Sequence, residues 1–91
     1  MTGPTPTLPG TPADIDDLRR EIDRLDEEIL AAVQRRSEIS RTIGAARLAS
    51  GGTKVVHTRE MAVLRRFGAL GPEGRQLAML LLSLGRGRLG H

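Results

Sequence analysis

Residues 15–46, IDDLRREIDRLDEEILAAVQRRSEISRTIGAA, carry the strongest structural signal in the chain. The apolar residues in this stretch recur every three or four positions, which is the spacing of one face of an α-helix. The stretch holds no proline, and Ser50, Gly51 and Gly52 after it supply a helix stop signal. The pattern predicts one helix over about residues 13–49, with a stripe made of Ile15, Leu18, Ile22, Leu25, Ile29, Ala32, Ile39, Ile43 and Ala46.

A helix of this length cannot bury its stripe inside one small chain. At a rise of about 1.5 Å per residue it is about 50 Å long. A compact monomer of 91 residues has a radius of gyration of only about 12 Å. The stripe therefore predicts a second copy of the chain as its partner.

The charge distribution indicates how the two copies run. Residues 14–28 hold eight acids and three arginines, a net charge of −5. Residues 29–91 hold eleven bases and three acids, a net charge of +8. An antiparallel partner lays the acidic half of one helix along the basic half of the other. We therefore expect an intertwined antiparallel homodimer.

The rest of the chain predicts two shorter helices. One covers about residues 58–69, with Thr58 as its cap and Met61, Leu64 and Phe67 inward. The pair Gly71-Pro72 is a turn and restart signal. The next helix covers about residues 72–84, with its buried side formed by Leu77, Leu80, Leu81 and Leu84. No segment alternates with a period of two, so the predicted fold class is all-α with three helices per chain.

Composition restricts the location and the chemistry. Residues 1–13 have no charged side chain and hold four of the five prolines. They predict a disordered leader before one domain over residues 14–91. The chain has no cysteine and two histidines, which excludes disulfide scaffolds and thiol nucleophiles and predicts no metal site. The longest apolar run, residues 77–82, is too short to cross a bilayer. A cytoplasmic protein with no membrane contact is expected.

The arginines on the apolar stripe indicate a binding site for a small anion. Arg36 occupies a stripe position, where an unpaired guanidinium costs several kcal/mol. Arg47 follows after about three full turns and points the same way. Arg59 and Glu60 arrive after a short connection. Arg19 lies about 25 Å before Arg36 along the helix, so an antiparallel partner must supply it.

The same residues resemble the small all-helical class of chorismate mutase. The shared pattern consists of Leu18-Arg19-Arg20-Glu21-Ile22-Asp23-Arg24-Leu25-Asp26, Arg35-Arg36, Ile43-Gly44-Ala45-Ala46-Arg47 and Thr58-Arg59-Glu60. The resemblance covers roughly residues 14–91. The segments 49–57 and 85–91 are similar to the small intracellular form that works with a DAHP synthase.

The resemblance implies an isomerase of the shikimate pathway that converts chorismate to prephenate, for phenylalanine and tyrosine biosynthesis, without a cofactor. Catalytic roles fall on Arg36, Arg47 and Glu60. Arg36 would hold a substrate carboxylate, with Arg19 reaching in from the other subunit. Arg47 would contact the ether oxygen and a carboxylate. Arg59 would bind the remaining carboxylate, and Glu60 would accept a hydrogen bond from the ring hydroxyl.

Two departures from the family pattern predict a weak free-standing catalyst that an activating complex with DAHP synthase would improve. Val56 stands where efficient relatives place an acid that contacts the ring hydroxyl. Leu82 and Arg86 fall near positions where relatives place Ser and Gln, so both enter the predicted substrate site. The glycine-punctuated tail, residues 86–91, is expected to respond to the synthase.

Two other functions compete with this interpretation. The thirteen arginines also fit a helical nucleic-acid-binding dimer. Against that function, the key arginines lie on the apolar stripe, and a single aromatic residue, Phe67, leaves no stacking platform for bases. A non-catalytic regulatory dimer is the second alternative, and the sequence excludes it less firmly.

Overall fold

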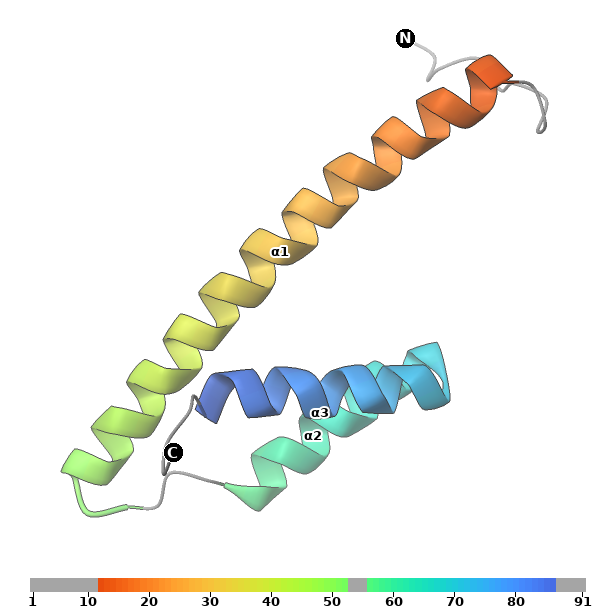
Figure 1. The fold of residues 1–91 in the computed structure, drawn as a ribbon. Coiled ribbons are helices and arrows are strands. Elements are labelled where there is room, and N and C mark those ends of the chain that lie inside the picture. The colour runs from red at the N-terminus through yellow and green to blue at the C-terminus, as the bar shows by residue number, and fades with distance from the viewer. Residues whose placement is uncertain (1–11, 53–55, 87–91) are drawn as a thin grey trace, which may run out of the picture. The chain divides into compact units, whose positions relative to one another are not determined.

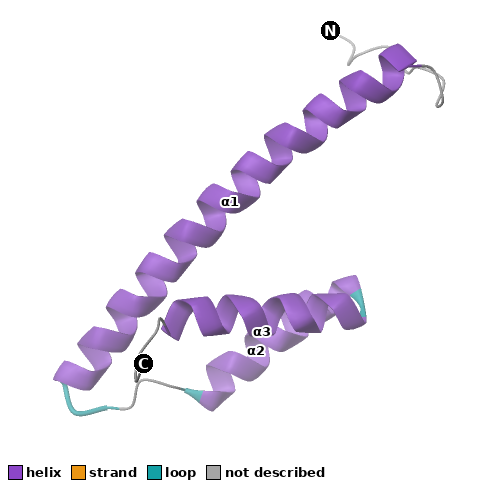
Figure 2. Cartoon of the chain, in the orientation of Figure 1, coloured by secondary structure: helices purple, strands orange, loops and turns teal. Residues whose placement is uncertain are grey.

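The structure, a computed structural model, describes residues 12–52 and 56–86 of the chain. In these two ranges the regular elements are α1 (Pro12–Ala49), α2 (His57–Phe67), the short 3-10 helix η1 (Gly68–Leu70) and α3 (Pro72–Arg86). Figure 2 shows helices and no strand among the described residues. The predicted all-α class with a long first helix is confirmed.

Several sequence predictions fall on the ends of the described ranges. Residues 1–11, most of the expected leader, lie outside them, and Pro12 and Ala13 are the first two residues of α1. The last five residues, 87–91, which form most of the expected tail, also lie outside the described residues. The same holds for residues 53–55 of the connection between α1 and α2.

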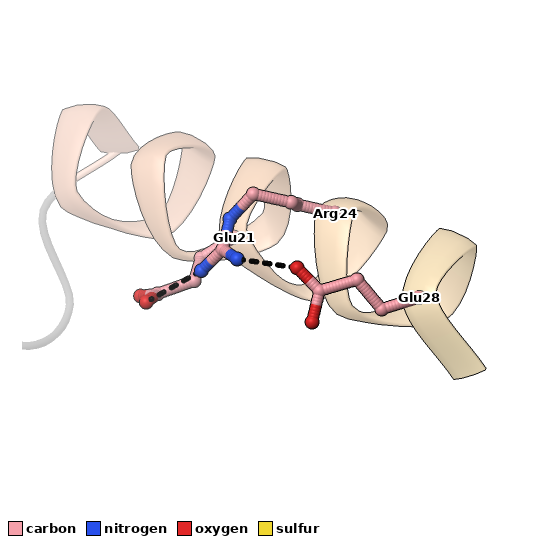
Figure 3. A network of polar contacts seen from close by, with 3 residues as sticks. All are labelled: Glu21, Arg24 and Glu28. Atoms are coloured by element: carbon pink, nitrogen blue, oxygen red, sulfur yellow. Dashed lines mark hydrogen bonds and ion pairs between the residues drawn. The ribbon is translucent and has the colours of Figure 1, made fainter. Parts of the chain in front are cut away.

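The chain divides into two compact units, residues 1–31 and 32–91. In the first unit, α1 keeps its apolar stripe exposed: Ile22 is 54% and Ile29 59% accessible. Its polar face carries ion pairs within the helix. Arg24 bridges Glu21 at 3.5 Å and Glu28 at 2.8 Å (Figure 3). Such exposed pairs contribute only about 0.3–0.5 kcal/mol each, so they support the helix without burying its stripe.

In the second unit, α2 and α3 lie side by side (Figure 1). The apolar core of the described residues consists of Val63, Ala78 and Leu81. The buried side of α3 follows Gly74, Ala78, Leu81 and Gly85, which are spaced by three and four. Leu81 is therefore the one predicted inward leucine of this helix that is buried.

Four other predicted core positions of these two helices are exposed in the single chain, whereas Leu64 and Phe67 on α2 are half-buried. Met61 is 51% exposed on α2, where the adjoining face with Val63 is buried instead. Leu77, Leu80 and Leu84 are 38%, 63% and 48% exposed. The physical reason is close helix contact, because glycine and alanine let two backbones approach where leucine would hold them apart. A prediction from side-chain size selects the neighbouring leucines.

The turn between α2 and α3 depends on glycines, as predicted. Gly71 has a φ of +85°, which favours glycine, and Pro72 begins α3. The Gly71 amide donates to the Gly68 carbonyl at 2.9 Å. A Cβ atom on Gly74 would lie 1.9 Å from the Phe67 carbonyl oxygen, so the first turn of α3 sits directly against the end of α2.

The ends of α1 and α2 differ in how well the sequence signals them. At the end of α1, Gly51 has a φ of +89° and donates to the Leu48 carbonyl at 3.0 Å, while Gly52 donates to the Arg47 carbonyl at 2.8 Å. This pair of bonds is a Schellman motif and confirms the predicted stop. At the start of α2, Thr58 is not the cap. The helix begins at His57, one residue earlier.

Candidate active site

Arginine side chains of α1 reach the last turns of α3. Arg36 Nη1 donates to the Leu81 carbonyl oxygen at 3.3 Å, and Arg36 is half-buried. Arg41 Nε donates to the Leu84 carbonyl oxygen at 3.4 Å. The Leu84 carbonyl lies in the last turn of α3, where an acceptor has no partner within the helix. Arg36, which was expected to be costly on the apolar stripe, therefore has a hydrogen-bond acceptor on another helix.

A close approach of backbones supports the same contact. A Cβ atom on Gly85 would lie 2.5 Å from Ser40 Oγ and 2.9 Å from Ser40 Cβ. Gly85 and Gly44 are both buried, and Ser40 is half-buried. These small residues therefore let α3 come close to α1. The short spacing between the helices lets the arginines of α1 reach the carbonyl oxygens of α3.

A cavity of about 600 Å³ opens between the three helices of the second unit. Every residue that lines it belongs to the range 32–86. The lining consists of Ala32, Arg35, Arg36, Ile39, Ser40, Ile43, Gly44, Arg47, Val56, Arg59, Glu60, Val63, Leu82, Gly85 and Arg86.

Seven of the eight predicted site residues lie around this one cavity: Arg36, Arg47, Val56, Arg59, Glu60, Leu82 and Arg86. They come from the second half of α1, from α2 with the residue before it, and from the end of α3. The eighth, Arg19, lies on α1 in the first unit, where it is exposed. The structure brings the seven together, and their individual roles stay predictions.

The cavity is strongly cationic. Five arginines and one carboxylate, that of Glu60, line it. Glu60 forms an ion pair with Arg86, and its side chain is only 20% exposed, against 43% for that of Arg86. Such a lining attracts a small molecule that carries more than one negative charge.

Reasoning from the sequence missed part of the lining. Arg35 was expected on the outer face of its helix. It borders the cavity, although its side chain is 72% exposed and pairs with Glu38 at 3.0 Å. Ile39, Ile43 and Val63 add apolar walls. The available signal was the helical spacing, because Ile39 and Ile43 follow Arg36 by three and seven residues on one face.

A sequence model of the family described as chorismate mutase type II matches residues 18–81, which is more than half of the chain. The chain belongs to this family. The match covers most of α1, all of α2 and α3 as far as Leu81, just before the α3 residues that border the cavity. The predictions of a chorismate mutase and of an isomerase are therefore confirmed, and the non-catalytic alternatives lose their support.

Curated relatives agree with this assignment to the chorismate mutases. The intracellular chorismate mutase of Mycolicibacterium smegmatis is 70% identical over 79 residues, which cover 86% of this chain and 76% of the relative. That of Mycobacterium tuberculosis strain H37Rv is 67% identical over 78 residues, covering 86% and 74%. Both relatives are named as intracellular enzymes, in agreement with the expected location inside the cell. Within the described residues, no helix is long and apolar enough to cross a membrane.

A solved structure shares the fold of this chorismate mutase. It is a chain of the non-covalent complex of DAHP synthase and chorismate mutase from Corynebacterium glutamicum, with a bound transition state analog. The TM-score is 0.79 at 56% sequence identity, and the match covers 86% of this chain and 95% of that chain. The three-helix architecture is therefore that of a chorismate mutase.

Proposed function

We propose that this chorismate mutase rearranges chorismate to prephenate in the cavity of the second unit. The observation that supports the proposal is the convergence of Arg36, Arg47 and Arg59 with Glu60 on one cavity. Chorismate carries two carboxylates, an ether oxygen and a ring hydroxyl. The lining offers cationic donors for the first three groups and one acceptor for the hydroxyl.

The reaction itself needs little from the protein besides shape and charge. In this Claisen-type rearrangement one C–O bond breaks as one C–C bond forms, within a single molecule and with no net proton transfer. The site must hold the dianion in its compact reactive conformation, which is an effect of orientation. It must also stabilise the negative charge that grows on the ether oxygen, and one fixed donor contributes about 3–4 kcal/mol to that.

The residue roles follow from chemistry and position. Arg36 and Arg59 bind the carboxylates, because a planar guanidinium meets a carboxylate with two parallel hydrogen bonds. Arg47 donates to the ether oxygen and to a carboxylate. Glu60 accepts from the ring hydroxyl. Val56 and Leu82 provide apolar contacts with the substrate.

The ion pair between Arg86 and Glu60 gives Arg86 a place in this scheme. Arg86 lines the same cavity as Glu60, so its positive charge acts on a substrate there as well as on the carboxylate. We propose that Arg86 fixes the orientation of the Glu60 carboxylate and adds a cationic contact for the substrate.

The decisive measurement is the loss of chorismate absorbance with no metal or cofactor added. The wild-type chain should convert chorismate, and Arg36→Ala should reduce kcat/KM by about 10²-fold or more, because a bound carboxylate loses its partner. Arg65→Ala is the matched control. Arg65 is an exposed arginine of α2 outside the cavity lining, and its loss should leave kcat/KM unchanged. Equal effects of the two substitutions would contradict the proposed site.

We further propose that each site is shared within an antiparallel homodimer. Arg19 lies seventeen residues before Arg36 on α1, a rise of about 25 Å along one helix. An antiparallel partner chain would bring its own Arg19 to the cavity. Arg19→Ala and Arg36→Ala homodimers should each be inactive, while a mixed dimer should regain activity, because one of its two sites is intact. Verified mixed dimers without activity would contradict the shared site.

The partner proposed for this enzyme is a DAHP synthase. The similar chain from Corynebacterium glutamicum was solved in a complex of that kind. We propose that the synthase binds this mutase and raises its kcat/KM by favouring an ordered active conformation. By linkage, chorismate-site ligands should then tighten the complex.

The test adds the cognate synthase to the full chain and to a chain that ends at Arg86. The shortened chain keeps the pair of Arg86 with Glu60 and removes only residues 87–91. Activation of the full chain alone would assign the effect to those five residues. Equal activation would remove them from the mechanism, and no activation of either chain would contradict the partnership.

A further inference from the structure

Gly52 touches the side chain of Arg47 more closely than a residue with a side chain could. Its amide donates to the Arg47 carbonyl oxygen at 2.8 Å. A Cβ atom on Gly52 would lie 2.9 Å from Arg47 Cγ, 3.3 Å from the Arg47 carbonyl oxygen and 3.7 Å from Arg47 Cδ. Because Gly52 has no Cβ atom, the first part of the Arg47 side chain can occupy this space.

The two glycines at the end of α1 meet different requirements. Gly51 has a φ of +89°, and a Cβ atom there would meet nothing within 4 Å. Its glycine is required by the backbone conformation. Gly52 has no such φ, so a larger residue there would be excluded by space, and the space is occupied by Arg47. The end of the helix explains why position 51 is glycine. It does not explain why position 52 also lacks a side chain.

This space matters because Arg47 reaches the cavity. Its side chain lines the cavity from the last turns of α1. The Cγ atom is the first atom that the torsion about Cα–Cβ moves, and that torsion has three staggered positions. A Cβ atom at position 52 would crowd Cγ and drive the Arg47 side chain toward another staggered position. A different staggered position would carry the guanidinium several ångströms away, whereas displacements of about 1 Å already cost about 10²-fold in rate.

We propose that Gly52 is a positioning residue for the reaction, because its lack of a Cβ atom lets the Arg47 side chain take the direction that brings its guanidinium to the cavity. This inference rests on the proposed role of Arg47 as the donor to the ether oxygen. Gly52 itself lies outside the cavity lining and acts only through Arg47.

The test is a cycle of four proteins: wild type, Gly52→Ala, Arg47→Ala and the double variant. Gly52→Ala should lower kcat about tenfold or more with a smaller change in KM, because a transition-state contact is displaced. In the Arg47→Ala background the added methyl group meets no Cγ atom, so the same substitution should change kcat less than twofold. Gly68→Ala is the matched control. Position 68 has an ordinary helical φ of −58° and open space around a Cβ atom, so kcat should not change.

The outcomes separate this inference from the proposal on which it rests. Full activity of Gly52→Ala, or an equal loss in both backgrounds, would overturn the positioning role. Full activity of Arg47→Ala would instead contradict the proposed role of Arg47. Thermal unfolding followed by circular dichroism is the second measurement. If Gly52→Ala fails to fold, the double variant should fold, because the crowded atom is gone. A double variant that also fails to fold would place the cause in the backbone and overturn the inference.

Discussion

At the scale of single residues, Arg47 connects the end of a helix with the chemistry of the cavity. Its carbonyl oxygen accepts from Gly52 and from the Ser50 hydroxyl at 3.0 Å, which fixes its backbone. Its side chain lines the cavity. A cation in the last turn also interacts favourably with the helix dipole. Two effects, on stability and on rate, are therefore expected from one guanidinium.

Arg47→Ala separates these effects. We expect kcat to fall by about 10²-fold or more, as on loss of an oxyanion donor. The free energy of unfolding should change by at most about 1 kcal/mol, the size of a helix-dipole contact. Steady-state kinetics and thermal unfolding of the same sample measure both. A variant that melts earlier and keeps its turnover would show that Arg47 is structural.

Arg86→Ala tests the ion pair with Glu60. The pair is partly exposed, so its loss should cost no more than about 1 kcal/mol of stability. Activity should fall further than stability, because Glu60 loses the group that orients its carboxylate. The control is Arg66→Ala, an exposed arginine of α2 outside the cavity lining. Unchanged kcat/KM in Arg86→Ala would remove Arg86 from the site.

At the scale of elements, the contact of α3 with the second half of α1 depends on small residues. Gly85 faces Ser40 at a distance that leaves no room for a methyl group. Arg36 and Arg41 then reach backbone carbonyls of α3. A change in the helix spacing would therefore move both the arginines and the wall of the cavity.

Gly85→Ala should disturb this contact. The added methyl group would lie 2.5 Å from Ser40 Oγ, and overpacking of this kind costs about 1–3 kcal/mol. Ser83→Ala, at an exposed position two residues earlier on the same helix, is the control and should leave stability unchanged or slightly raised. Chemical denaturation measures both. A Gly85→Ala protein as stable as the control would contradict the tight contact.

At the scale of the whole molecule, the exposed apolar stripe of the first unit supports the proposed dimer. Leu18 and Leu25 are 52% and 44% exposed in the single chain, next to Ile22 and Ile29. Burial of apolar surface is worth about 25 cal/mol per Å², so leaving a stripe of this kind in water is unfavourable. A second copy of the chain offers an equivalent stripe, with charges that suit an antiparallel arrangement.

Light scattering at micromolar concentration should therefore give about twice the chain mass of 9.8 kDa. Leu25→Glu should abolish the dimer and the activity together, because a charge would be buried between the two apolar stripes. Glu28→Gln, on the polar face, should leave both unchanged. A compact, stable monomer of the wild-type chain would contradict the dimer.

The sequence by itself determined the helices, their order and most of the site. The period of the stripe, the glycine stop after α1 and the Gly71-Pro72 restart were readable because they are local properties of the backbone. Arg36 and Arg47 were readable because a charge on an apolar stripe is costly unless it has a partner. Val56, Leu82 and Arg86 entered the predicted site only through the resemblance to the family.

Tertiary structure alone decided which face of each short helix is buried and what surrounds the arginines. Leucine size pointed to Leu77, Leu80 and Leu84, whereas close approach selected Gly74, Ala78 and Gly85 together with Leu81. The partnership of Arg86 with Glu60 joins residues of two different helices. Such contacts depend on distances between backbones, which no periodicity of the sequence records.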